Sequence, residues 1–105
     1  MKLSIISPVY QAEEIVDELL LRITQEASKI TDDFEILLVE DGSADNSWSK
    51  IKNHCKHNSH VVGIKLSRNF GQHYAITAGI QRAKGDYIIL MDCDLQDNPK
   101  YFSLL

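Results

Sequence analysis

The sequence predicts an α/β protein in which a mainly parallel sheet lies between layers of helices. Four short apolar runs, residues 3–9, 34–39, 61–66 and 87–91, are near-continuous rather than alternating, which is typical of strands covered on both faces. The three segments between them have helical periodicity and the length that crossovers between parallel strands need. The order β-α-β-α-β-α-β therefore predicts a three-layer α/β/α arrangement.

Each helical segment has one apolar face, which we expect to pack on the sheet. The first face holds Ile15, Val16, Leu19, Leu20, Ile23 and Ala27, the second Trp48, Ile51 and Cys55, and the third Ala75, Ile76, Gly79, Ile80 and Ala83. Asp45 or Ser47 is the expected cap of the second helix. Gly79 lowers helix propensity, which predicts close backbone packing at that point of the third helix.

Composition narrows the class of protein. The chain has 105 residues, 44% hydrophobic and 25% charged, as in an ordinary soluble domain. Its net charge of -4 argues against a nucleic-acid-binding domain. Cys55 and Cys93 are too few for a disulfide framework, and the apolar run at the N-terminus is too short for a signal peptide or a membrane span. We therefore expect a cytoplasmic protein with reduced thiols.

The sharpest chemistry follows the fourth predicted strand, where Asp92, Asp94 and Gln96 occur at alternate positions. Ligands of open α/β sheets bind beyond the carboxyl ends of the strands. Carboxylate and amide oxygens are ligands for Mg²⁺ or Mn²⁺, and Mg²⁺ takes only one or two protein carboxylates. An Asp-x-Asp alone would more often be a solvated loop, but its place after a buried strand favours a metal site.

Two further strand ends carry polar residues with two interpretations each. Glu40 and Asp41, followed by Gly42 and Ser43, form either a turn or a site where Asp41 accepts hydrogen bonds from a nucleobase or ribose, and we favour the second. Arg68 either neutralises an acid, Asp41 or Asp92, or meets diphosphate oxygens.

The histidines between residues 54 and 60 do not have a zinc-site spacing, and we interpret them with Cys55 as an exposed polar surface.

Several motifs in one order give the chain a family resemblance. They are Ser7-Pro8-Val9-Tyr10 with Glu13-Glu14, Val39 to Ser47 (VEDGSADNS), Leu66 to Gly71 (LSRNFG), Ala78-Gly79, and Gly85-Asp86 through Met91 to Asp97 (MDCDLQD). With them the chain resembles the N-terminal part of inverting family 2 glycosyltransferases of the GT-A fold. Within that family it looks most like the branch that acts on polyprenyl or dolichyl phosphate. The resemblance covers nearly the whole chain.

The resemblance implies roles for particular residues. Pro8, Tyr10 and Glu13 look like the residues that line a nucleoside pocket, and Asp41 is similar to the acid that contacts the base or ribose. Arg68 sits where the family has a basic side chain near the donor. Asp92, Asp94 and Gln96 look like the ligands of Mg²⁺ or Mn²⁺ on the donor diphosphate, with Asp92 also near the nucleotide. Gln11-Ala12 departs from the commoner Asn-Glu, which we expect to alter a turn contact but not the fold.

The implied function is transfer of a hexose from a UDP- or GDP-sugar to an acceptor, with a polyprenyl phosphate at the membrane as a candidate. Residues 1–105 are then the nucleotide-sugar-binding, Rossmann-like N-terminal portion of a GT-A domain, truncated before its acceptor half. We find no catalytic base in the chain and expect the isolated portion to be inactive. A cell-envelope role, the cytoplasmic face of the membrane and a homo-oligomer are compatible with this function. The alternatives are a non-catalytic nucleotide-binding fragment or pseudoenzyme and, less favoured, a signalling receiver domain, which needs paired acids after the first strand.

Overall fold

The computed structural model describes residues 2–91 and 103–104. The elements in chain order are β1 (Leu3–Val9), α1 (Val16–Ser28), β2 (Phe34–Glu40), α2 (Ser47–His57), β3 (Val61–Lys65), α3 (Gln72–Arg82), β4 (Tyr87–Leu90) and β5 (Ser103–Leu104). All four predicted strands and all three predicted helices are present.

The strands form a single sheet in the order β3-β2-β1-β4-β5. The first four are parallel, and β5, which the sequence did not predict, pairs antiparallel with β4. β1 lies at the centre, where Ile5 pairs with Ile36 of β2 and Ile89 of β4. The mainly parallel α/β fold is therefore confirmed.

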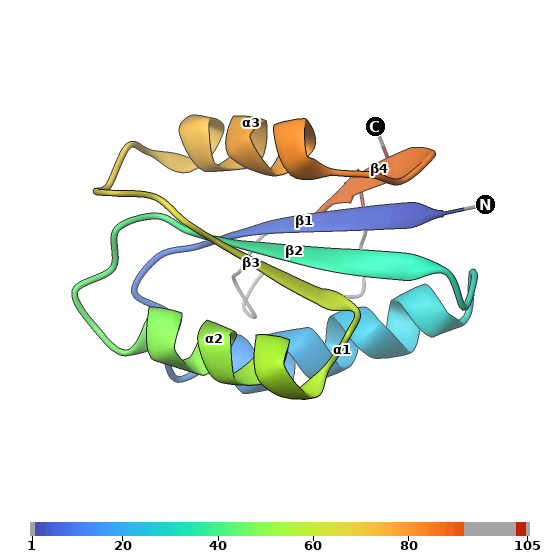
Figure 1. Cartoon of the computed structure of the whole chain (residues 1–105), viewed down its shortest axis with the longest axis horizontal. Coiled ribbons are helices and arrows are strands. Elements are labelled where there is room, and N and C mark those ends of the chain that lie inside the picture. The colour runs from blue at the N-terminus through green and yellow to red at the C-terminus, as the bar shows by residue number, and fades with distance from the viewer. Residues whose placement is uncertain (1, 92–102, 105) are drawn as a thin grey trace.

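Helices cover both faces of the sheet, α1 and α2 on one side and α3 on the other (Figure 1). Alternation along β1 divides the core, because Ile5 packs in the cluster that includes α1 and α2, whereas Ile6 packs in the cluster that includes α3. Ile51 of α2 is fully buried, and Trp48 and Cys55 are partly buried against the same cluster. The predicted inner faces of α1 and α2 are confirmed.

The face that α3 packs on the sheet differs in part from the prediction. Ala75 and Gly79 are buried, but Ile80 is 41% exposed, so its placement on the inner face was wrong. The close packing predicted at Gly79 is confirmed, since a Cβ there would lie 2.5 Å from Cγ2 of Ile6. Because α3 lies so close to β1, the small residues Ala75 and Gly79 contact the sheet and Ile80 points outward.

A buried carboxylate organises the amino end of the sheet. Glu35 of β2 accepts hydrogen bonds from Ser4 Oγ at 2.6 Å and from Lys84 N at 2.7 Å, and Ser4 Oγ in turn accepts one from Gly85 N at 2.8 Å. A Cβ at Gly85 would lie 2.7 Å from Ser4 N, so glycine is needed for this contact. The turn between α3 and β4 is thereby fixed to β1 and β2.

In the part of the chain that the structure describes, none of the helices is long and apolar enough to cross a membrane.

Candidate functional site

Three loops gather where the parallel strands end, at the left in Figure 1. They are the β1–α1 loop (residues 10–15), the β2–α2 loop (residues 41–46) and the β3–α3 loop (residues 66–71). This is the edge at which ligands of open α/β sheets bind. Hydrogen bonds from the middle loop, β2–α2, reach both of its neighbours.

Glu40, the last residue of β2, closes the middle loop on itself. It is 1% exposed, and its carboxylate accepts hydrogen bonds from the backbone amides of Gly42, at 3.2 Å, and Ser43. A buried carboxylate needs such donors to offset the loss of water. Glu40 therefore shapes the loop.

Asp41 holds the β3–α3 loop. It is 3% exposed, and its Oδ1 accepts the amide of Phe70 at 2.9 Å while its Oδ2 accepts the amide of Gly71 at 3.1 Å. Asn69 Nδ2 donates to the backbone oxygen of Asp41 at 3.0 Å. Gly71 is the N-cap of α3, so the carboxylate also lies at the positive end of that helix.

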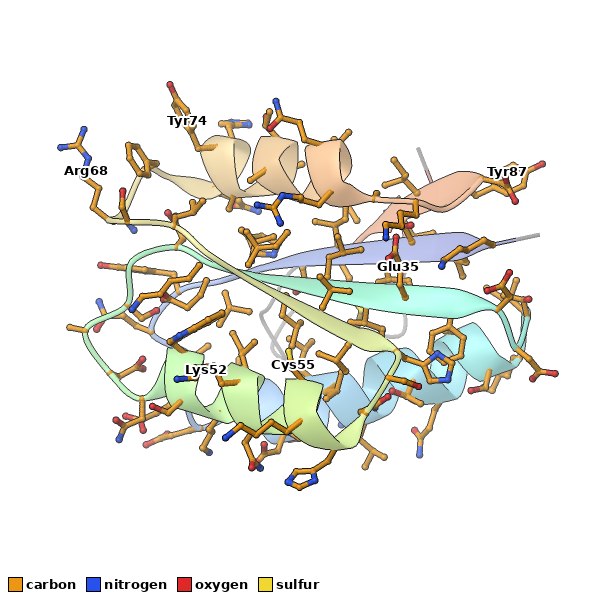
Figure 2. All side chains as sticks on the ribbon, viewed as in Figure 1. Glu35, Lys52, Cys55, Arg68, Tyr74 and Tyr87 are labelled. Carbon is orange, nitrogen blue, oxygen red and sulfur yellow. The ribbon has the colours of Figure 1, made fainter. Side chains whose placement is uncertain are left out.

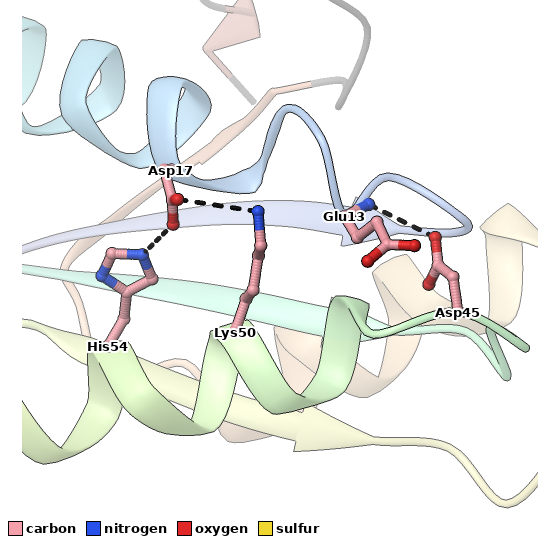
Figure 3. A network of polar contacts seen from close by, with 5 residues as sticks. All are labelled: Glu13, Asp17, Asp45, Lys50 and His54. Atoms are coloured by element: carbon pink, nitrogen blue, oxygen red, sulfur yellow. Dashed lines mark hydrogen bonds and ion pairs between the residues drawn. The ribbon is translucent and has the colours of Figure 1, made fainter.

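The β1–α1 loop is held by three consecutive backbone amides. Gln11 N donates to Ser43 Oγ at 2.7 Å, Ala12 N to Ser47 Oγ at 3.0 Å, and Glu13 N to Asp45 Oδ2 at 3.3 Å (the last in Figure 3). Gln11 has a φ of 48°, in the left-handed region that asparagine tolerates better than glutamine. The hydrogen bond at this position is made by the backbone amide of Gln11, and the expected difference from the family in a turn contact stays a prediction.

The start of α2 differs from the expected capping. Asn46 is the N-cap and makes no side-chain cap bond. Asp45 Oδ1 accepts both the backbone amide of Ser47, at 3.0 Å, and its hydroxyl, at 2.6 Å. Burial raises the pKa of Asp45, but the bonds from Ser47 and Glu13 more than offset this, and the pKa is lowered from its ordinary value of 3.8.

A hollow of about 410 Å³ opens beside the β1–α1 loop. Its lining residues are Tyr10, Gln11, Ala12, Glu13, Glu14, Ile15 and Asp45. Of the residues predicted to bind a nucleoside, Tyr10 and Glu13 line it, Pro8 is buried in β1, and Asp41 is buried beneath the adjoining loops. The structure thus places two of the four at the hollow, whereas Pro8 and Asp41 do not line it.

Arg68 lies on a different part of this edge and points away from the sheet, as does Tyr74 (Figure 2). Its guanidinium carbon is 4.8 Å from the centre of the Phe70 ring, and the rings of Phe70 and Tyr74 are 5.4 Å apart. Among the described residues Arg68 forms no ion pair, so its predicted pairing with Asp41 is not present. The other alternative, contact with a diphosphate, stays a prediction.

The interpretation of the histidines between residues 54 and 60 and Cys55 as an exposed polar surface was wrong in part, because only His57 among them is exposed, Cys55 packs against the core, and His54 and His60 have separate partners. His54 Nε2 donates to Asp17 Oδ1 at 2.6 Å, with Lys50 Nζ 3.7 Å from the other oxygen (Figure 3). The hydrogen bond from His54 lowers the pKa of Asp17. His60 stacks on Phe34 with 4.0 Å between ring centres. Within the described ranges, no group of three or more His, Cys, Asp or Glu residues is arranged to hold a metal.

The predicted metal ligands, Asp92, Asp94 and Gln96, lie outside the described residues, and so does Cys93. The chain leading to them is placed, since Met91 N donates to Ile6 O at 2.9 Å and continues the pairing of β4 with β1. Met91, which precedes Asp92 in the sequence, thus lies at the carboxyl end of the strand beside β1.

Prediction from sequence missed the residues that connect the loops. Ser43, Asp45 and Ser47 were considered only as turn or cap residues. Their spacing carried a usable signal, because Asp and Ser side chains in turns commonly bond nearby backbone amides. The neighbours that they hold are about thirty residues away in sequence, and only the sheet order brings them together.

The fold and the site together define an open α/β protein with its candidate binding site at the carboxyl edge of a parallel sheet. Residues 4–105 match the family model described as glycosyl transferase family 2. The chain belongs to this family.

Solved structures share the fold. S. aureus TarS 1-349 has 23% identity and a TM-score of 0.74, over 90% of this chain and 28% of that one. Mannosyltransferase PcManGT from Pyrobaculum calidifontis, in complex with GDP-Man and Mn²⁺, has 20% identity and a TM-score of 0.77, over 88% and 27%. TarS 1-349 with UDP-GlcNAc has 24% identity and a TM-score of 0.73, over 92% and 30%. The chain thus spans less than a third of each, and the likeness supports the predicted GT-A type of fold.

Proposed function

We propose that this chain is the donor-binding part of a glycosyltransferase that moves a hexose from a UDP- or GDP-sugar to an acceptor. The observation that carries the proposal is the hollow at the carboxyl edge of a family 2 chain, lined by Tyr10 and Glu13. Solved proteins of the same fold hold GDP-Man with Mn²⁺, or UDP-GlcNAc. The geometry is compatible with a nucleotide that enters beside the β1–α1 loop.

In this proposal the donor contacts Tyr10, Glu13, Arg68 and Asp92, whereas Pro8 and Asp41 are buried and act without touching it. Tyr10 is 48% exposed, so its ring is available to stack on a base. Arg68 is exposed and can approach a diphosphate with a forked pair of donors. Pro8 is buried in β1 and does not line the hollow.

A divalent cation, Mg²⁺ or Mn²⁺, is part of the same proposal. Two carboxylates and an amide oxygen, from Asp92, Asp94 and Gln96, suit a hard cation, and they follow the strand end that Met91 fixes beside β1. When bound, the cation would supply Lewis-acid stabilisation of the leaving diphosphate. The protein's own residues would bind and orient the nucleotide.

We further propose that the acceptor is a polyprenyl phosphate, which is already anionic and would need no general base. It would place the protein at the cytoplasmic face of the membrane, in cell-envelope synthesis. A non-catalytic nucleotide-binding protein is the alternative, and it predicts nucleotide binding without transfer.

Calorimetry on the protein that contains this chain tests the proposal, with UDP and GDP titrated in the presence and absence of Mn²⁺. We expect metal-dependent binding of one nucleotide, and a loss of at least tenfold in affinity in an Asp92→Ala, Asp94→Ala variant. The matched control is Asp32→Ala, Asp33→Ala, which removes the same charge from exposed positions before β2. Full metal-dependent affinity in the first variant would reject the metal site.

Transfer is measured separately, as release of UDP or GDP from the matching sugar donor when polyprenyl phosphate is added. Binding without release in the intact protein would favour the non-catalytic alternative.

A further inference from the structure

We propose that Asp41 is a positioning residue, which acts on the donor by holding the β3–α3 loop and therefore Arg68 in place. The consequence for donor binding rests on the function proposed above. The structural part, that the Asp41 carboxylate fixes residues 68–71, is independent of it.

The bonds of the carboxylate are the first support. Each oxygen of Asp41 accepts a backbone amide of the β3–α3 loop, Phe70 at 2.9 Å and Gly71 at 3.1 Å, and Asn69 Nδ2 lies 3.5 Å from Oδ2. With 3% of the residue exposed, the carboxylate faces protein rather than solvent. Bonds of a carboxylate to backbone amides are of the charge-assisted, stronger kind.

Steric contact beside Asp41 is the second support. Gly42 has a φ of 73°, and a Cβ there would lie 2.2 Å from Asn69 N and 2.4 Å from the carbonyl carbon of Arg68. The β2–α2 loop therefore touches the backbone of Arg68 itself. The hydrogen bonds of Asp41 and the contact at Gly42 fix the loop on both sides of Asn69.

The position of Arg68 is the third support, because the fixed loop carries this side chain. Its side chain is exposed, stacks on Phe70 and has no ion pair among the described residues, so its charge is available to an anion. Phe70 is held through its own amide by Asp41. A fixed loop reduces the ordering cost when an anionic ligand binds, which is the usual benefit of preorganisation.

The competing hypothesis is direct contact between Asp41 and the nucleobase, and the two differ in base dependence. A positioning role affects every diphosphate to the same degree. A direct contact affects mainly the base that donates to the carboxylate. The two hypotheses also differ in whether the effects of substituting Asp41 and Arg68 depend on each other. If Asp41 acts through Arg68, substituting Asp41 loses its effect on affinity once Arg68 is removed.

The experiment is a double-mutant cycle on the protein that contains this chain, with Asp41→Asn, Arg68→Ala and the double variant. UDP, GDP and inorganic pyrophosphate, each with Mn²⁺, are titrated by calorimetry. We expect Asp41→Asn to weaken all three by a similar factor, roughly five- to twentyfold, and to have little further effect in Arg68→Ala. Weakening confined to one nucleotide, or effects that multiply in the double variant, would overturn the proposal.

Amide hydrogen exchange tests the structural part even if no nucleotide binds. Protection of Phe70 and Gly71 should fall at least tenfold in Asp41→Asn and remain in the control Glu35→Gln, which alters the buried carboxylate at the other end of the sheet. If Asp41→Asn does not fold, Asn69→Ala removes only the bonds from Asn69 and should lower the same protection by a smaller factor. Unchanged protection in the folded variant would reject the positioning role.

Discussion

The two ends of the sheet use the same device for different purposes. At the amino end Glu35, 7% exposed, accepts bonds from Ser4 Oγ and Lys84 N. At the carboxyl end Asp41, 3% exposed, accepts the amides of Phe70 and Gly71. In both places a buried carboxylate fixes a segment that is distant in sequence.

The surroundings of these carboxylates differ. At the amino end the bonds close the turn at Gly85 onto β1. At the carboxyl end they hold the β3–α3 loop with its exposed Arg68, at the same edge of the sheet as the hollow that the exposed Tyr10 lines. A buried acid bonded to backbone amides is therefore no sign of a binding site by itself; exposed side chains next to a hollow are.

The largest expected effects come from Gly42 at the carboxyl end and Gly85 at the amino end. Gly42→Ala puts a Cβ 2.2 Å from Asn69 N at a φ of 73°, and we expect a loss of about 3 kcal/mol in the free energy of unfolding. Gly85→Ala, 2.7 Å from Ser4 N, should cost about 2 kcal/mol. Urea unfolding measures both.

Nucleotide affinity per folded molecule then separates the two ends. Gly42→Ala should lower it and Gly85→Ala should not. Equal loss in both variants would contradict the division between a binding end and a structural end.

Two serines at the carboxyl end of the sheet, Ser47 and Ser43, should differ in how much their removal lowers the free energy of unfolding. Ser47 is fully buried and accepts Ala12 N, so Ser47→Ala leaves a buried amide unpaired and should cost about 1–2 kcal/mol. Ser43 is only partly buried, and water can replace its bond to Gln11 N, so Ser43→Ala should cost about 0.5 kcal/mol. Thermal unfolding of both variants checks the order, and the reverse order would show that the two bonds do not differ by burial.

Acid should loosen the β1–α1 loop through Asp45. Its pKa is lowered in the folded protein, so its carboxylate adds stability above pH 3.8, and this contribution is lost as the pH falls through the depressed value. Exchange protection of the Glu13 amide should then decrease below about pH 4 in the wild type. Asp45→Asn should remove this pH dependence, and Asp32→Asn, at an exposed site near the amino end, should retain it.

The smallest effect is expected at Gln11. Asn at a φ of 48° is better tolerated than Gln, so Gln11→Asn should raise the free energy of unfolding by a few tenths of a kcal/mol. The bond from the backbone amide of residue 11 to Ser43 is unaffected by this change. Equilibrium unfolding in urea measures the gain, with Gln25→Asn in α1, where a small loss is expected, as the control.

The fold could be predicted from the sequence because each strand is an almost continuous apolar run. Residues 3–9 were predicted with the bounds that β1 has, and β2 to β4 differ by one residue at their ends. β5 was not predicted, since two residues, Ser103 and Leu104, carry no periodicity. Ile80 was misplaced because helical spacing predicts which face of a helix is apolar but not how much of that face contacts the sheet. In α3 the close approach of Gly79 to Ile6 narrows this contact, and Ile80 lies outside it.

The sequence predicted which edge of the sheet carries polar loops, but not the bonds within those loops. Tyr10 and Glu13 line the hollow at this edge, and their contact with a nucleoside stays a prediction. The donors to the Asp41 carboxylate could not be foreseen, because Phe70 and Gly71 donate through backbone amides, which any residue except proline has.

The same property bears on how such a site can diversify. Residues 11–13 are held by their amides, and the side chains that hold them belong to the β2–α2 loop. At Gln11 and Glu13 the attachment uses no side chain, and only proline and the positive φ of Gln11 limit the choice of residue, whereas Ala12 is buried in the core. The lining of the hollow can therefore vary at residues 11 and 13 while its frame is kept, and a new ligand preference would arise there more easily than through Ser43, Asp45 and Ser47.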